Sequence, residues 1–226
     1  MFLDRGRRRD EHTDRGPGVP PGSWFRAHLH MIVAAFLMGA GSAAVWNYGR
    51  THLVEAGASD EVSVAAWIAL GLGGTAVIAS ARPLSSRHPR TAWAITTLAV
   101  AAASAVLGIA PGLTATALLA CAAFGWGYTA GTGALIAWTT RINAVGAPAG
   151  ASLLFIVLVL GQALGATAVG ALVMTAGSTV AFLVATLLSL TAAVLPFLQK
   201  ARSGQSEPDT CPEPVEGPGH RMHRVT

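Results

Sequence analysis

Apolar residues fill six long stretches of this chain, and short polar segments separate them. A membrane-spanning helix needs about 20 mainly apolar residues to cross roughly 30 Å of hydrocarbon. Each stretch is long enough for one such helix. The pattern therefore predicts a transmembrane domain over residues 28–199, with six helices at 29–48, 62–81, 91–109, 113–138, 148–174 and 179–198.

Charged residues are nearly absent from these stretches. The whole chain is 12% charged, whereas about a quarter of the residues of a soluble domain are charged. No Asp or Glu occurs between Glu61 and Lys200. A soluble protein would need a charged outer surface over such a length, but a protein surrounded by lipid does not. The sequence thus predicts an all-α membrane protein whose first partner is the lipid bilayer.

The two ends of the chain have a different composition. Residues 1–27 mix Arg, Asp, Gly and Pro, and residues 200–226 are rich in Pro, Gly and Glu. Segments of this kind hold too few apolar residues to form a core. We expect both to be disordered and cytoplasmic.

Lys and Arg residues predict how the helices are oriented. If both termini are cytoplasmic, 14 of the 15 Lys and Arg residues fall in cytoplasmic segments, and only Arg50 falls outside. Cytoplasmic loops of membrane proteins carry such an excess. One extra or missing span would reverse every later loop, so the charges support the count of six. The Ala- and Arg-rich composition is typical of bacterial proteins, which favours a plasma-membrane location.

Motifs for catalysis or cofactor binding are absent from the sequence. It contains no glycine-rich phosphate loop, no His or Cys pair with metal-ligand spacing, and no Asp or Glu in the predicted helices. Basic residues sit between apolar stretches, where orientation in the membrane explains them better than nucleic-acid binding. We therefore expect no enzyme activity, no cofactor, no metal and no nucleic-acid partner.

Uncharged polar and aromatic side chains inside the predicted helices are the candidate binding residues. A polar group in lipid is costly unless it has a partner, so it marks either a packing contact or a solute site. Gln162 lies near the centre of the fifth predicted helix, and both an interhelical hydrogen bond and a solute contact remain open for it. The other candidates lie in the first and fourth helices: Asn47, Tyr48, Trp126, Tyr128 and Thr132.

Three segments together resemble the C-terminal six-helix half of a transporter of the major facilitator superfamily. The loop after the second predicted helix is similar to the signature loop of that family, which reads approximately Gly-x-Leu-x-Asp-Arg-x-Gly-Arg. Leu84, Arg87 and Arg90 keep the spacing of this motif. Three residues depart from the motif: Arg82 replaces its first Gly, Ser86 replaces its Asp and Pro89 replaces its second Gly.

The other two segments lie in the helices. Residues 161–170 are similar to a Gly-Gln-x-x-Gly-Pro…Gly stretch of the family, with Ala166 in place of the Pro. Residues 46–50 and 67–74 look like its seventh and eighth helices. The resemblance covers about residues 28–198.

This resemblance implies half of a major-facilitator-type fold, built from two inverted three-helix repeats around a cavity. It implies that the first and fourth helices line the cavity with their candidate residues and that Gln162 lies close to it. The signature-loop residues Leu84, Arg87 and Arg90 would belong to a gate.

The implied function is movement of a small solute by alternating access. One half needs a second six-helix half or a homodimer to enclose a cavity. A truncated or inactive transporter fragment also remains open, as does a membrane interaction or assembly protein that transports nothing.

Overall fold

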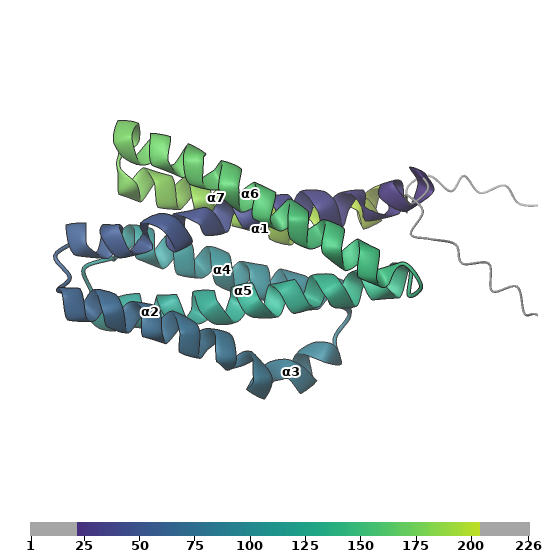
Figure 1. The fold of residues 1–226 in the computed structure, drawn as a ribbon, viewed down its shortest axis with the longest axis horizontal. Helices are drawn as coiled ribbons and strands as arrows, with labels where there is room; N and C mark the ends of the chain where they lie inside the picture. Colours follow the sequence, from purple (N-terminus) through teal and green to yellow (C-terminus); the bar gives the residue numbers. More distant parts are fainter. Residues whose placement is uncertain (1–21, 204–226) are drawn as a thin grey trace, which may run out of the picture.

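The computed structural model describes residues 22–203, and this part of the chain contains helices and no strand (Figure 1). The prediction of an all-α fold is confirmed for these residues. In chain order the helices are α1 (Gly22–Glu55), α2 (Asp60–Thr75), α3 (Val77–Ser85), α4 (Pro89–Ile109), α5 (Thr114–Ile142), α6 (Ala147–Ala176) and α7 (Ser178–Ser203).

Helix ends differ from the predicted boundaries in several places. α1 begins at Gly22, inside the segment that we expected to be disordered, and it continues to Glu55 through residues expected to form a loop. α7 extends to Ser203, past the predicted end of the membrane domain. The remaining parts of the predicted disordered segments, 1–21 and 204–226, lie outside the described residues.

Five segments of residues 22–203 are long and apolar enough to cross a membrane, as in a multi-pass membrane protein. They are His28–Glu55, Asp60–Ser85, Pro89–Ile109, Ala147–Ala176 and Ser178–Leu198. α5, which corresponds to the fourth predicted helix, is not among them. Its 29 residues are sufficient in length, but its middle reads Phe-Gly-Trp-Gly-Tyr-Thr-Ala-Gly-Thr-Gly and is only weakly apolar. Length and composition thus support five of the six predicted spans.

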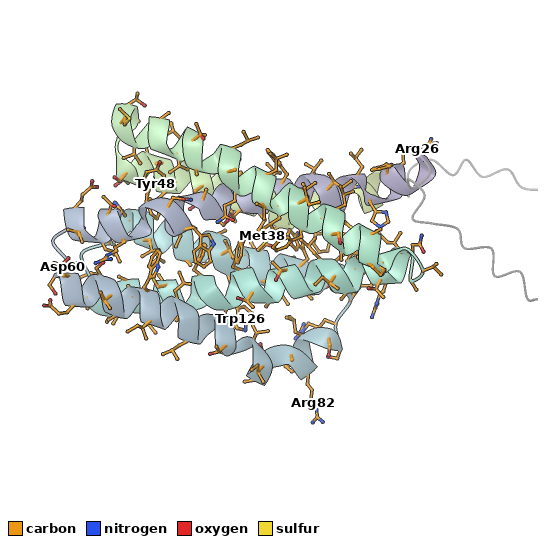
Figure 2. The ribbon with its side chains drawn as sticks, viewed as in Figure 1. Arg26, Met38, Tyr48, Asp60, Arg82 and Trp126 are labelled. Atoms are coloured by element: carbon orange, nitrogen blue, oxygen red, sulfur yellow. The ribbon has the colours of Figure 1, made fainter. Side chains whose placement is uncertain are left out.

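The helices run back and forth between two ends of the bundle. Figure 1 shows α1, α4 and α6 running in one direction and α2, α5 and α7 returning. The end where α1 begins, here called the arginine end, carries Arg26, Arg82, Arg87, Arg90 and Arg141 in its helix termini and connections. The opposite end, here called the acidic end, carries Arg50, Glu55, Asp60 and Glu61. Labelled side chains in Figure 2 show Arg26 and Asp60 at these opposite ends.

Helix pairing follows a pattern that occurs twice. α1 packs against α6 and α7, α5 packs against α2 and α4, and α4 and α7 pack against each other. Exchanging α1 with α5, α2 with α6 and α4 with α7 leaves these pairings unchanged. α1 and α5 run in opposite directions (Figure 1), so the exchange reverses the direction of each helix.

Glycines bring α1 and α6 into direct backbone contact. A Cβ atom on Gly39 would collide with the carbonyl oxygen of Leu158, and one on Gly161 would collide with the carbonyl oxygen of Phe36. Only a residue without a side chain permits this approach. Small residues take such positions in membrane proteins because close packing, rather than the hydrophobic effect, holds helices together in lipid.

The same contact recurs between α2 and α5. A Cβ on Gly125 would collide with the carbonyl oxygen of Leu70, and one on Gly73 with that of Ala122. In each of these four helices, the glycine lies three residues after the residue whose carbonyl oxygen meets the glycine of the partner helix. The corresponding glycines Gly39 of α1 and Gly125 of α5 differ by 86 in residue number, and Gly73 of α2 and Gly161 of α6 differ by 88. The repeated pairing is therefore matched residue by residue.

Two histidines of α1 are buried and connect it to other helices. His28, near the arginine end, has its Nε2 3.0 Å from the hydroxyl oxygen of Thr139 on α5. His52, near the acidic end, has its Nε2 3.1 Å from the carbonyl oxygen of Leu107 on α4, and its ring stacks on Phe182 of α7. These contacts link α1 to three helices that lie elsewhere in the chain.

We predict that Gly161→Ala and Gly73→Ala each lower the free energy of unfolding by about 1–3 kcal/mol, because the added methyl group forces the helices apart. Gly71→Ala and Gly133→Ala are matched controls, since a Cβ at either position meets nothing within 4 Å. Unfolding in mixed micelles, followed by circular dichroism, measures the change. Equal effects in all four variants would contradict the packing described above.

Candidate functional site

Aromatic side chains from three helices form a cluster inside the bundle. Trp46 of α1 makes edge-on contacts, with ring centroids 5.6 Å from Tyr128, 5.8 Å from Phe124 and 6.4 Å from Trp67. Phe124 and Tyr128 lie one turn apart on α5, and their rings are 6.0 Å apart and nearly parallel. Aromatic pairs favour these separations and angles. The cluster joins α1 and α5, the two helices that correspond to each other in the repeated pairing, and α2.

Trp46, Tyr128 and Gln162 bring polar atoms to this cluster, and we refer to these three residues together as the polar group. The Tyr128 hydroxyl is 3.5 Å from Oε1 of Gln162 on α6, at the outer limit of a hydrogen bond. The indole Nε1 of Trp46 is buried and has no hydrogen-bond partner among the described residues. A buried donor without a partner is costly. The polar group thus holds hydrogen-bonding capacity that the described helices leave unused.

Other predicted site residues lie apart from the polar group. Asn47 is exposed, and its Nδ2 donates to the carbonyl oxygen of Ala43 on its own helix. Tyr48 donates from its hydroxyl to the carbonyl oxygen of Ala166 on α6, at 3.2 Å. Thr132 donates to the carbonyl oxygen of Thr129 one turn earlier in α5. These bonds are typical of helix packing and of satisfied polar side chains.

Trp126 also lies away from the polar group. Its Nε1 donates to the hydroxyl of Ser80 on α3 at 2.8 Å, on the side of α5 that faces α2 and α3 (Figure 2). Tyr128, two residues later, points to the other side. The structure therefore brings Tyr128 and Gln162 together and separates Trp126 from both.

Trp46 is not among the binding residues predicted from the sequence. Adjacent residues of a helix point about 100° apart, because there are 3.6 residues per turn. Trp46, Asn47 and Tyr48 therefore face three different directions. No feature of the sequence marks which of the three faces α5.

The predicted gate residues lie at the arginine end. Leu84 and Arg87 line a cavity between α3 and α5. Arg90 lies at the start of α4, with its guanidinium carbon 5.7 Å from the centre of the Trp138 ring on α5. This distance is within the range of a cation–π contact. Arg90 therefore anchors α4 to α5, whereas Arg87 faces the cavity.

The exposed surface of α5 near the arginine end is unusual for a helix in lipid. Its exposed residues there are mainly small or polar: Thr129, Gly133, Ala137 and Thr140, with Ile136 as a large apolar neighbour. We call these five residues the α5 stripe. α5 is also the long helix that lacks the composition of a membrane span. Its composition and its surface both suit contact with water or protein better than contact with hydrocarbon.

No protein family, no curated protein and no solved structure matches this chain. Within residues 22–203, no group of three His, Cys, Asp or Glu side chains lies close enough to hold a metal ion.

We predict that Phe124→Ala lowers the free energy of unfolding by about 3–5 kcal/mol, because this ring is fully buried and its loss leaves a cavity. Tyr128→Phe keeps the ring contacts and removes only the hydroxyl, so its cost should stay below about 1.5 kcal/mol. Unfolding in mixed micelles measures the free energy of unfolding of both variants. A similar loss in both variants would mean that the Tyr128 hydroxyl is a structural contact and is not available to a ligand.

Proposed function

We propose that this chain is one half of a secondary transporter of the major-facilitator type, which moves a small neutral solute across the plasma membrane by alternating access. The observation that carries the proposal is the repeated pairing, in which α1, α2–α3 and α4 correspond to α5, α6 and α7 with reversed direction. Inverted repeats of this kind are typical of secondary transporters, because the two repeats let a cavity open to either side.

The α5 stripe supports a second half. A polar helix surface is unfavourable against hydrocarbon, where no water is available to its polar groups. A second six-helix half, or a second copy of this chain, would cover the stripe and enclose a cavity. Tyr128 lies on another side of α5 from the stripe, with its hydroxyl 3.5 Å from Oε1 of Gln162 on α6. We assign solute binding to these two side chains.

The charge distribution supports a neutral solute and a facilitated or otherwise coupled mechanism. No Asp or Glu occurs between Glu61 and Lys200, so a homodimer of this chain would have no carboxylate inside the membrane to carry a proton. The arginine end would face the cytoplasm, since cytoplasmic segments carry the excess of Lys and Arg.

A membrane assembly protein is the second candidate, and the same stripe favours it. A helix of a partner protein would also cover small and polar residues closely. The two candidates differ in whether water reaches the stripe, because a transporter cavity is wet and a helix–helix contact is dry.

We predict that Ile136→Cys, at a stripe position that is 54% exposed and does not line the cavity between α3 and α5, reacts with a membrane-impermeant maleimide in intact vesicles. The variant lacks the two native cysteines, Cys121 and Cys211. Maleimides react with the thiolate, which forms in water and not in hydrocarbon. Ile68→Cys is the matched control, because Ile68 is 58% exposed on the outer surface of α2.

The transporter proposal requires labelling of Ile136→Cys from both sides of the membrane and no labelling of Ile68→Cys. Absence of labelling at Ile136 would reject a water-filled cavity and favour the assembly protein. A native mass measurement in mild detergent then separates a homodimer from a monomer that needs a different second half.

A further inference from the structure

The two matched halves differ where the helix bends at Ala76. α2 and α3 together correspond to α6, but α6 continues without a break to Ala176. Figure 1 shows α3 leaving the bundle, whereas Gly165 at the corresponding point of α6 still touches Ala40 of α1. The difference therefore lies near the arginine end of the α2–α3 and α5 pair.

Side-chain size explains this difference. On the α1–α6 side, a Cβ on Gly165 would come within 2.6 Å of Cα of Ala40, so the two backbones touch. With the offsets of 88 and 86 residues, Val77 and Trp126 take the positions of Gly165 and Ala40. Two large side chains replace a glycine and an alanine, and the helices cannot approach. Trp126 occupies the space and bonds to Ser80 of α3.

The separation of α3 from α5 leaves a cavity of about 230 Å³. Its walls are mostly apolar or small and come from α3, α5 and the start of α4, with Ala81, Leu84, Ala130 and Gly133 among them. Two charged side chains also line it: Arg87 from the α3–α4 connection and Arg141 from the last turn of α5. The cavity thus combines a hydrocarbon-like wall with two positive charges.

No carboxylate of the described chain is available to these arginines. Asp and Glu are absent between Glu61 and Ser203, and the described acidic residues occupy the acidic end of the bundle. Arg side chains bind phosphate oxygens through paired N–H donors. Basic pockets between transmembrane helices on the cytoplasmic side bind anionic lipid headgroups. Charge and lining together therefore fit a ligand with a phosphate group and a hydrocarbon chain.

We propose that this cavity binds one anionic phospholipid of the surrounding bilayer, with its phosphate at Arg87 and Arg141 and an acyl chain between α3 and α5. Trp126 keeps the site open by holding α3 away from α5. Thr129, Gly133 and Ala137 of the α5 stripe also line this cavity, so the lipid would cover that part of the stripe in a chain that lacks a second half. Tyr128 and Gln162 take no part in the site.

Native mass spectrometry of the purified chain tests the proposal, with phosphatidylglycerol and phosphatidylcholine offered together in equal amounts. We expect phosphatidylglycerol to be retained several-fold better. The double variant Arg87→Gln/Arg141→Gln should lose this preference. The matched control is Arg26→Gln/Arg82→Gln, which removes two exposed charges from the same end but outside the cavity. An equal loss in both double variants would reject the site in favour of general surface attraction.

Filling the cavity is an independent test. Gly133→Leu should abolish retention, because a side chain at Gly133 enters open space in the cavity. Gly71→Leu adds the same side chain at an exposed position of α2 that is equally open, and it should retain the lipid. Retention by Gly133→Leu, or no preference for phosphatidylglycerol in the unmodified chain, would overturn the proposal.

Closing the cavity tests the role of Trp126. The double variant Val77→Gly/Trp126→Ala recreates the residues that let α6 touch α1, so α3 should approach α5 and the lipid should be lost. Circular dichroism confirms that this variant is folded. Oleate serves as a probe without a phosphate, and displacement of phosphatidylglycerol by equimolar oleate would mean that the site takes a fatty acid and not a phospholipid.

Discussion

Direct contact between glycine backbones and the carbonyl groups of neighbouring helices sets the arrangement of the bundle. In lipid, apolar surfaces gain little by meeting each other, so helices associate where they pack most closely. Gly39 and Gly161 join α1 to α6, and Gly73 and Gly125 join α5 to α2. These contacts determine where α1 and α5 lie, and through them which side chains meet in the bundle.

The position of α5 follows from these contacts and explains its composition. α5 packs against α2 and α4 along much of its length, so its glycines serve helix contacts and its exposed residues need not be large and apolar. A helix covered mainly by protein has less need for the apolar surface of a membrane span. The weak apolar character of residues 124–133 is therefore a consequence of their position, and the α5 stripe is the part that the described helices leave uncovered.

The two halves of the bundle illustrate how a repeated backbone arrangement acquires a specific feature. The same glycine contacts occur in both halves, yet Val77 and Trp126 replace the small residues found at Gly165 and Ala40. The other half also has a cavity, of about 210 Å³, which Ala40 and Gly165 line together with other apolar residues. Arg87 and Arg141 line only the cavity between α3 and α5, so a nearly symmetric scaffold carries two charges at one of these two cavities.

The number of apolar stretches, the all-α class and the separation of arginines from acidic residues can all be predicted from the sequence, because they depend on composition and spacing along the chain. The sequence also marked Tyr128 and Gln162 as polar groups inside helices. The contacts between helices are needed to see that Tyr128 faces Gln162, that Trp46 joins them and that Trp126 turns toward Ser80. In α5 and α6, large apolar residues are spread around the helix and do not mark one buried side. A helix that is similar on all sides does not indicate its own rotation, and contacts with its neighbours determine which residues face each other.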